Sequence, residues 1–105
     1  MARTAFAAKE QRQAAREEVF YRTRGTSAAG APLALLVVNI SAMGLMARCD
    51  GSFAPGDRIK VLLPVIGITD AEVRWALGGR IGCELDQPIA LHDYYALLAA
   101  LVKGR

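Results

Sequence analysis

The stretch EVRWALGGRIGCEL, residues 72–85, carries the clearest fold signal in the chain. Polar and apolar residues alternate along EVRWAL, so Val73 and Trp75 are expected on one face of a β-strand. Gly78 and Gly79 then form a two-residue turn signal, because glycine tolerates the positive φ angles that tight hairpins need. RIGCEL reads as the returning strand, and the stretch predicts a β-hairpin.

Further strands are predicted upstream of this hairpin. RIKVLLPVI at residues 58–66 alternates, with Ile59, Val61 and Leu63 on one face and Lys60 on the other. LALLVVNI at residues 33–40 is apolar throughout, which is typical of a strand covered on both faces. The remaining candidates are the segment from Val19 to Thr23 and LMARC at residues 45–49. Six short strands separated by turn residues predict a mainly β fold, either a small antiparallel barrel or a sandwich.

The end of the chain has a different period. Apolar residues recur at helical spacing at Leu91, Tyr94, Tyr95, Leu98, Leu101 and Val102. We expect a C-terminal α-helix that packs against the β-structure or caps one mouth of a barrel. A dimer surface is the alternative, so the expected state is a monomer or a weak homodimer.

Length and composition limit the class of protein. The 105 residues correspond to one domain, and 53% hydrophobic residues indicate a globular chain. The longest apolar run, LALLVV, is too short to span a membrane, and the first residues lack the apolar core of a secretory signal. The expected location is therefore the cytoplasm, where Cys49 and Cys83 would be reduced and buried. Two cysteines and His92 have no metal-site spacing, so no metal site is expected.

Positive charge is concentrated near the start of the chain. Residues 1–24 hold six basic and three acidic side chains, whereas residues 25–105 hold seven of each. This asymmetry suggests an anionic partner for the first segment. Residues 2–16 have Phe6 as their one large apolar anchor, so we expect a flexible basic arm over residues 1–16 and a single domain over residues 17–105.

Two short motifs stand at a defined spacing. RQAAR, residues 12–16, has the form RxxxR, and NISAMG, residues 39–44, has the form (D/N)xSxxG. Alone, the first is compatible with a solvated helix face and the second with a turn. Together, with 22 residues between Arg16 and Asn39, they resemble the signature of PilZ domains, which are receptors for the bacterial second messenger cyclic di-GMP. The similarity continues through EVRWALGGRIGCEL.

The resemblance implies a six-stranded antiparallel β-barrel with cyclic di-GMP held between the N-terminal arm and NISAMG. Arginine suits this ligand because its planar fork bonds bidentately to a guanine edge or to phosphate. Asparagine can donate to and accept from a guanine edge, serine can donate to phosphate, and glycine permits close backbone approach. The expected ligand-binding residues are Arg12, Arg16, Asn39, Ser41 and Gly44.

Three further residues are secondary candidates. Gln11 precedes the first arginine, at a position that the resemblance links to the binding of one or two ligand molecules. Trp75 has two readings, a core residue or a surface platform that stacks on a guanine. Arg80 is either a phosphate contact or a solvated residue of the hairpin. The number of ligand molecules stays open.

The sequence shows no catalytic constellation, so no enzymatic activity and no cofactor are expected. The expected function is that of a stand-alone receptor whose arm becomes ordered on binding cyclic di-GMP and relays the signal to an effector protein of the motility, adhesion or exopolysaccharide machinery. DNA binding and membrane insertion are not expected. One alternative is a PilZ-like interaction module that binds no nucleotide. The other is a small basic barrel that binds single-stranded nucleic acid.

Overall fold

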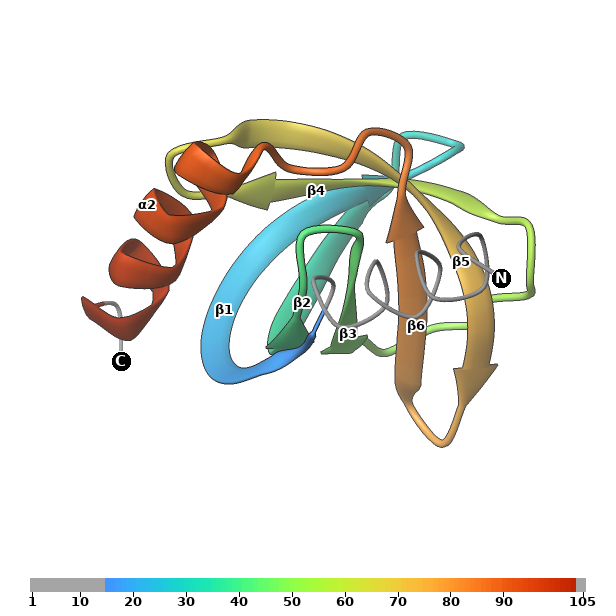
Figure 1. The fold of residues 1–105 in the computed structure, drawn as a ribbon. Helices are drawn as coiled ribbons and strands as arrows, with labels where there is room; N and C mark the ends of the chain where they lie inside the picture. The colour runs from blue at the N-terminus through green and yellow to red at the C-terminus, as the bar shows by residue number, and fades with distance from the viewer. Residues whose placement is uncertain (1–14, 104–105) are drawn as a thin grey trace, which may run out of the picture.

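The computed structural model describes residues 15–103, which form one closed β-barrel with a helix at its end. Six antiparallel strands close in the order β1-β2-β3-β6-β5-β4 (Figure 1). Their bounds are β1 Glu17–Ser27, β2 Pro32–Ile40, β3 Gly44–Arg48, β4 Arg58–Leu63, β5 Gly67–Leu77 and β6 Arg80–Leu85. The helix α2 spans Leu91–Lys103. The expected mainly β fold, a six-stranded antiparallel barrel with a C-terminal helix, is confirmed.

The β-hairpin predicted for residues 72–85 is present. β5 and β6 are joined by Gly78 and Gly79, whose φ angles of 61° and 78° place both in the left-handed region. Two positive φ angles in a two-residue loop define a type I′ turn, whose twist matches that of the strands. β4 also follows its pattern, since Ile59, Val61 and Leu63 are buried while the residues between them are exposed.

The alternation predicted for EVRWAL fails at Trp75. Val73 is fully buried, but the Trp75 side chain is 39% exposed. The register of β5 against β6 shifts between these two residues, because Val73 pairs with Cys83 and Trp75 with the next residue, Gly82. A β-bulge of this kind adds one residue to a strand and turns the following side chains to the other face. Arg74 and Trp75 consequently both point outward.

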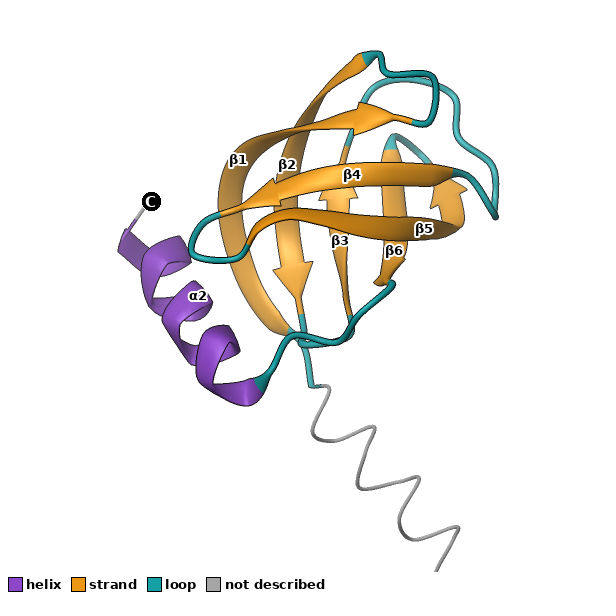
Figure 2. Ribbon diagram, turned by 90° about the horizontal axis from the view of Figure 1, so that it is seen from above, coloured by secondary structure: helices purple, strands orange, loops and turns teal. Residues whose placement is uncertain are grey.

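The expectation that β2 is covered on both faces is wrong. Leu35, Val37 and Ile40 are buried inside the barrel, whereas Leu36 and Val38 on the outer face are only half-buried. A barrel of this size has one interior, and α2 covers one end of it rather than the outside of β2 (Figure 2). The apolar run therefore reflects one buried face and one apolar but largely uncovered face.

β1 closes the barrel by changing partners. It pairs with β2 from Glu17 to Thr26 and with β4 from Gly25 to Ser27, and it curves strongly between the two (Figure 1). At the change, a side chain on Gly25 would lie 2.1 Å from the backbone oxygen of Lys60. Strands approach this closely at a barrel corner only where glycine stands, so Gly25 permits closure.

The helix packs against the barrel end beside β1, as Figures 1 and 2 both show. Leu97 and Leu101 are fully buried in the core, and the Tyr94 hydroxyl donates a hydrogen bond of 3.2 Å to the backbone oxygen of Ile40. This confirms the packing prediction. Half of the predicted apolar face points away from the barrel, however, since Leu91, Tyr95 and Val102 are exposed. None of the described helices is long and apolar enough to span a membrane.

The two cysteines are buried and free, as expected. Burial raises the pKa of the Cys83 thiol to about 12, and the nearby Cys49 adds to this shift. Because alkylation requires the thiolate, we expect Cys83 to react with iodoacetamide at least about a hundredfold more slowly in the native protein than in denaturing urea. Mass spectrometry of the labelled peptides at mildly alkaline pH measures both rates. Equal rates would contradict the buried position of Cys83.

Candidate ligand-binding site

The two halves of the sequence motif meet at the start of β1. Arg16 lies directly before β1, and its Nη1 donates a hydrogen bond of 3.0 Å to Oδ1 of Asn39 near the end of β2. The two strands run antiparallel, and their register pairs Glu18 with Asn39, which brings Arg16 alongside this position. Among the described residues the Asn39 amide nitrogen makes no hydrogen bond, so it is free to donate to a ligand.

Ser41 is buried in the turn between β2 and β3. Its hydroxyl accepts hydrogen bonds from the backbone nitrogens of Met43 at 3.1 Å and Gly44 at 3.2 Å. Its own backbone nitrogen donates to the Gly44 oxygen at 2.8 Å. These contacts give Ser41 a clear structural role, because a hydroxyl that bonds the following amides shapes a tight turn. A direct contact between Ser41 and ligand phosphate stays a prediction.

Gly44 is required by strand packing. A side chain at this position would lie 2.3 Å from the backbone oxygen of Cys83 on β6. Gly44 opens β3 and pairs with Glu84, so the two backbones approach closely at the edge of the candidate site. The glycine therefore allows close approach as the sequence analysis expected, but the approaching group is the neighbouring strand.

A hollow of about 300 Å³ lies beside this turn, lined among others by Arg16, Gly44, Arg74 and Trp75. The Trp75 indole lies against Gly82, since a side chain added there would lie 2.1 Å from the indole Nε1. An aromatic ring that covers a cross-strand glycine is held in place by the pair. Trp75 therefore lies at the surface, and the core reading is wrong. That its indole stacks on a guanine stays a prediction.

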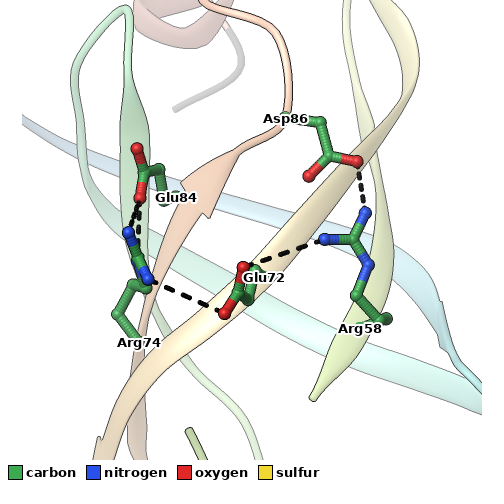
Figure 3. Close-up of polar contacts among 5 residues, drawn as sticks. All are labelled: Arg58, Glu72, Arg74, Glu84 and Asp86. Atoms are coloured by element: carbon green, nitrogen blue, oxygen red, sulfur yellow. Dashed lines mark hydrogen bonds and ion pairs between the residues drawn. The ribbon is translucent and has the colours of Figure 1, made fainter. Parts of the chain in front are cut away.

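An ion-pair network runs from the hollow across the outside of three strands (Figure 3). Arg74 on β5 donates from Nε to Glu84 on β6 at 2.7 Å and lies 3.7 Å from Glu72. Glu72 also lies 4.0 Å from Arg58 on β4, which pairs with Asp86. Glu72 and Glu84 are cross-strand neighbours, so Arg74 offsets the repulsion between two like charges.

Arg74 and Glu84 also line the hollow, although the sequence pattern does not predict them as site residues. The alternating pattern predicts Arg74 on the face opposite Trp75, whereas the bulge puts both on the outside. The available signal was Gly82, a glycine within a strand, because such a residue often marks a bulge or a close contact.

Of the remaining candidates, Arg80 is not among the described residues that line the hollow. Arg80 pairs with Arg48 at the far end of β6, whereas Glu84 beside the hollow pairs with Gly44. Arg80 thus lies two residues along β6 from Gly82, the partner of Trp75, and on the side away from the β2–β3 turn. Arg12 and Gln11 lie outside the described residues 15–103, as does most of the predicted arm.

The site offers positive charge, an aromatic face and amide groups in one place. Arg16 and Arg74 each present a planar guanidinium that can pair with phosphate or stack on a purine. Trp75 presents an exposed indole face, and the Asn39 amide can meet a base edge. Within residues 15–103, no group of His, Cys, Asp and Glu side chains is arranged to hold a metal ion. The arrangement is suited to binding a nucleotide with a purine base and a phosphate.

Neither a protein-family model nor a curated protein matches the chain. Several solved structures, however, are similar to it. The PilZ domain of CeSA from a cellulose-synthesizing bacterium aligns with 85% of this chain and 96% of its own, at 12% identity and a TM-score of 0.59. The PilZ domain of YcgR from Escherichia coli, solved with c-di-GMP, aligns with 86% of this chain and 88% of its own, at 15% identity and a TM-score of 0.58.

A third similar structure is the inhibitor of motility MotI/DgrA from Bacillus subtilis, at 25% identity and a TM-score of 0.56. The alignment covers 84% of this chain and 47% of that protein, so the chain spans about half its length. All three alignments cover at least 84% of the chain, far more than an isolated hairpin. The chain therefore has the fold of a PilZ domain.

Proposed function

We propose that the protein is a receptor that binds cyclic di-GMP in the hollow beside the β2–β3 turn. The observation that carries the proposal is the 3.0 Å hydrogen bond from Arg16 to Asn39. It joins the RxxxR and (D/N)xSxxG motifs at the rim of a hollow that also contains an exposed indole. A PilZ domain of the same fold was solved with this ligand, which supports the choice of nucleotide.

The chemistry of the site supports a guanine dinucleotide over a simple anion. Arg12 and Arg16 supply forks for phosphate oxygens or for the O6 and N7 atoms of guanine. Trp75 supplies a flat surface for a base, and Asn39 supplies a donor and an acceptor. Gln11 precedes Arg12 in the sequence, at the position that the resemblance links to the number of ligand molecules bound.

We further propose that the ligand draws the segment carrying Arg12 onto the barrel. A ligand that contacts both the barrel and the Arg12 segment binds more tightly when the segment lies against the barrel. The ligand shifts the population toward that closed state by the difference between its affinities for the closed and open states. A partner protein can then read the changed surface. The effectors we propose belong to motility, adhesion or exopolysaccharide export, and the chain itself would perform no catalysis.

Titration calorimetry tests the receptor proposal. Cyclic di-GMP is expected to bind the full-length chain at micromolar or lower concentration, while GMP and a short single-stranded oligonucleotide bind far more weakly. The same titration gives the number of ligands per chain. An absence of heat with cyclic di-GMP would favour the interaction module that binds no nucleotide. Equal binding of the oligonucleotide, weakening steeply with salt, would favour the nucleic-acid reading.

Trp75 provides both a contact and a reporter, because it is the one tryptophan of the chain. Its fluorescence is expected to change on addition of cyclic di-GMP. Replacement by alanine is expected to weaken binding by about 1–3 kcal/mol, the usual contribution of one aromatic–base stack. Calorimetry of Trp75→Ala measures the loss, and Trp75→Phe is expected to retain most of the affinity. Unchanged affinity in Trp75→Ala would place the base elsewhere.

A further inference from the structure

A row of side chains crosses the outside of the barrel at the end opposite the β2–β3 turn. Leu36 of β2 pairs with Arg22 of β1 on one side and Arg48 of β3 on the other. Arg48 pairs in turn with Arg80 of β6, and Arg80 pairs with Leu77 of β5. Residues in register lie side by side on one face of a sheet. We name Arg22, Leu36, Arg48, Arg80 and Leu77 the arginine row.

The arginine row faces outward. The residues next to it along their strands, Leu35, Ala47 and Ile81, are buried in the barrel, so the row occupies the opposite face. All three arginines are exposed, and Leu77 is 79% exposed. In Figure 1 the β5–β6 turn beside the row points away from the β2–β3 turn, which separates the row from the hollow proposed for the nucleotide.

The charge of the row is not neutralised within residues 15–103. Neither Arg22, Arg48 nor Arg80 forms an ion pair there, whereas Arg58, Lys60 and Arg74 are all paired with carboxylates. Arg48 and Arg80 stand directly opposite each other, and like charges in that position cost stability. Residues 25–105 carry equal numbers of basic and acidic side chains. The arginine row is nevertheless a region whose positive charge has no carboxylate partner among the described residues.

The surroundings of the row indicate what kind of anion fits. A hollow of about 520 Å³ lies along it, lined by Arg22, Leu36, Arg48 and, among others, the carboxylate-bearing Asp50. The guanidinium of Arg22 lies 5.8 Å from the centre of the Phe20 ring, so one face of that ring is already covered by a cation.

We propose that the arginine row docks an extended segment of a protein partner that presents both acidic and apolar side chains to the row. Arginine forks pair bidentately with carboxylates, and Leu36 and Leu77 provide apolar contacts between and beside them. The row follows five adjacent strands of the closed barrel and curves with its outer surface, so an extended segment that contacts the whole row bends along it. Single-stranded nucleic acid is the weaker candidate, because successive bases require open aromatic rings that the row does not offer.

This inference goes beyond the proposed receptor function and does not depend on nucleotide. Fluorescence anisotropy of three labelled probes of equal length tests it in the absence of cyclic di-GMP: a Glu/Leu peptide, a Lys/Leu peptide and a single-stranded oligonucleotide. The Glu/Leu peptide is expected to bind the full-length protein and to weaken with added salt. The double variant Arg48→Gln/Arg80→Gln is expected to raise its Kd at least about tenfold.

Arg58→Gln/Lys60→Gln is the matched control, since it removes the same charge from β4, away from the row. Its Kd for the Glu/Leu peptide is expected to stay within about twofold of the native value, because both residues it replaces are exposed and already paired. An equal loss of affinity for the Glu/Leu peptide in the two double variants would overturn the proposal, because binding would then depend on the net charge of the protein and not on the arginine row. Tighter binding of the oligonucleotide than of the Glu/Leu peptide, or no binding of that peptide, would overturn it as well. A chain that fails to bind cyclic di-GMP would leave this result intact.

Discussion

Replacement of Arg16 by alanine is expected to abolish measurable cyclic di-GMP binding at micromolar ligand. Loss of charge-assisted hydrogen bonds that become desolvated in the complex costs about 2–4 kcal/mol, which corresponds to a roughly 30- to 800-fold rise in Kd. In the structure without ligand the Arg16 guanidinium is exposed and held by Asn39 at 3.0 Å. It is therefore available without disturbing the core, and the thermal midpoint of the variant should match the native one. Calorimetry and thermal unfolding measure the two quantities.

Two further variants separate geometry from charge. Arg16→Lys keeps the charge but loses the planar fork, so its affinity is expected to fall at least about tenfold. Arg24→Ala removes an exposed arginine from the outside of β1, away from the hollow, and should bind as the native chain does. Arg12→Ala is expected to behave like Arg16→Ala. If Arg16→Ala and Arg24→Ala bound equally well, the site would not be at the junction of the two motifs.

The strands were predictable because most of them obey one simple rule. β4 alternates from Arg58 to Leu63 with every second residue inside, so its sequence reports both its existence and its faces. The hairpin at Gly78 and Gly79 was predictable because its φ angles of 61° and 78° suit glycine in particular. In both cases the signal lies within a few neighbouring residues, which a single sequence displays.

Features that depend on pairing between strands were not predictable. The bulge at Trp75 exists only in the register of β5 against β6, and it decides which residues line the hollow. The outer face of β2 is apolar in sequence yet is not covered, because coverage is set by where α2 packs. The sequence beyond residue 24 has seven basic and seven acidic residues, which does not reveal which of them form ion pairs. In the fold, Arg58, Lys60 and Arg74 pair with carboxylates, whereas Arg48 and Arg80 have no ion pair among the described residues.

The roles of the residues in NISAMG were also not predictable from residue type alone. NISAMG was identified by residue type, and the structure gives two of its positions roles in the fold itself. Ser41 bonds the backbone of its own turn, and Gly44 makes room for the Cys83 carbonyl. Asn39, in contrast, accepts the hydrogen bond from Arg16 through Oδ1, and its amide nitrogen has no partner among the described residues. Loss of binding in a variant of this motif therefore has to be separated from loss of the turn.

Gly44→Ala provides that separation. Its new methyl group would lie 2.3 Å from the backbone oxygen of Cys83, a contact that only a shift of β3 against β6 relieves. Overpacking against backbone in a closed barrel is expected to cost about 3 kcal/mol or more, and to lower the thermal midpoint by about 12 °C or more. Circular dichroism during heating measures the shift in the absence of ligand.

Gly30→Ala is the matched control for the substitution itself. Gly30 has a φ of 86° and open space around its Cα, so alanine there meets backbone strain of about 1–2 kcal/mol and no steric contact. Its midpoint should therefore fall less than that of Gly44→Ala. A Gly44→Ala variant that unfolds at the native temperature but no longer binds cyclic di-GMP would show the opposite of our assignment. Gly44 would then act on the ligand alone, and the close approach of β3 to β6 would not be what requires a glycine at this position.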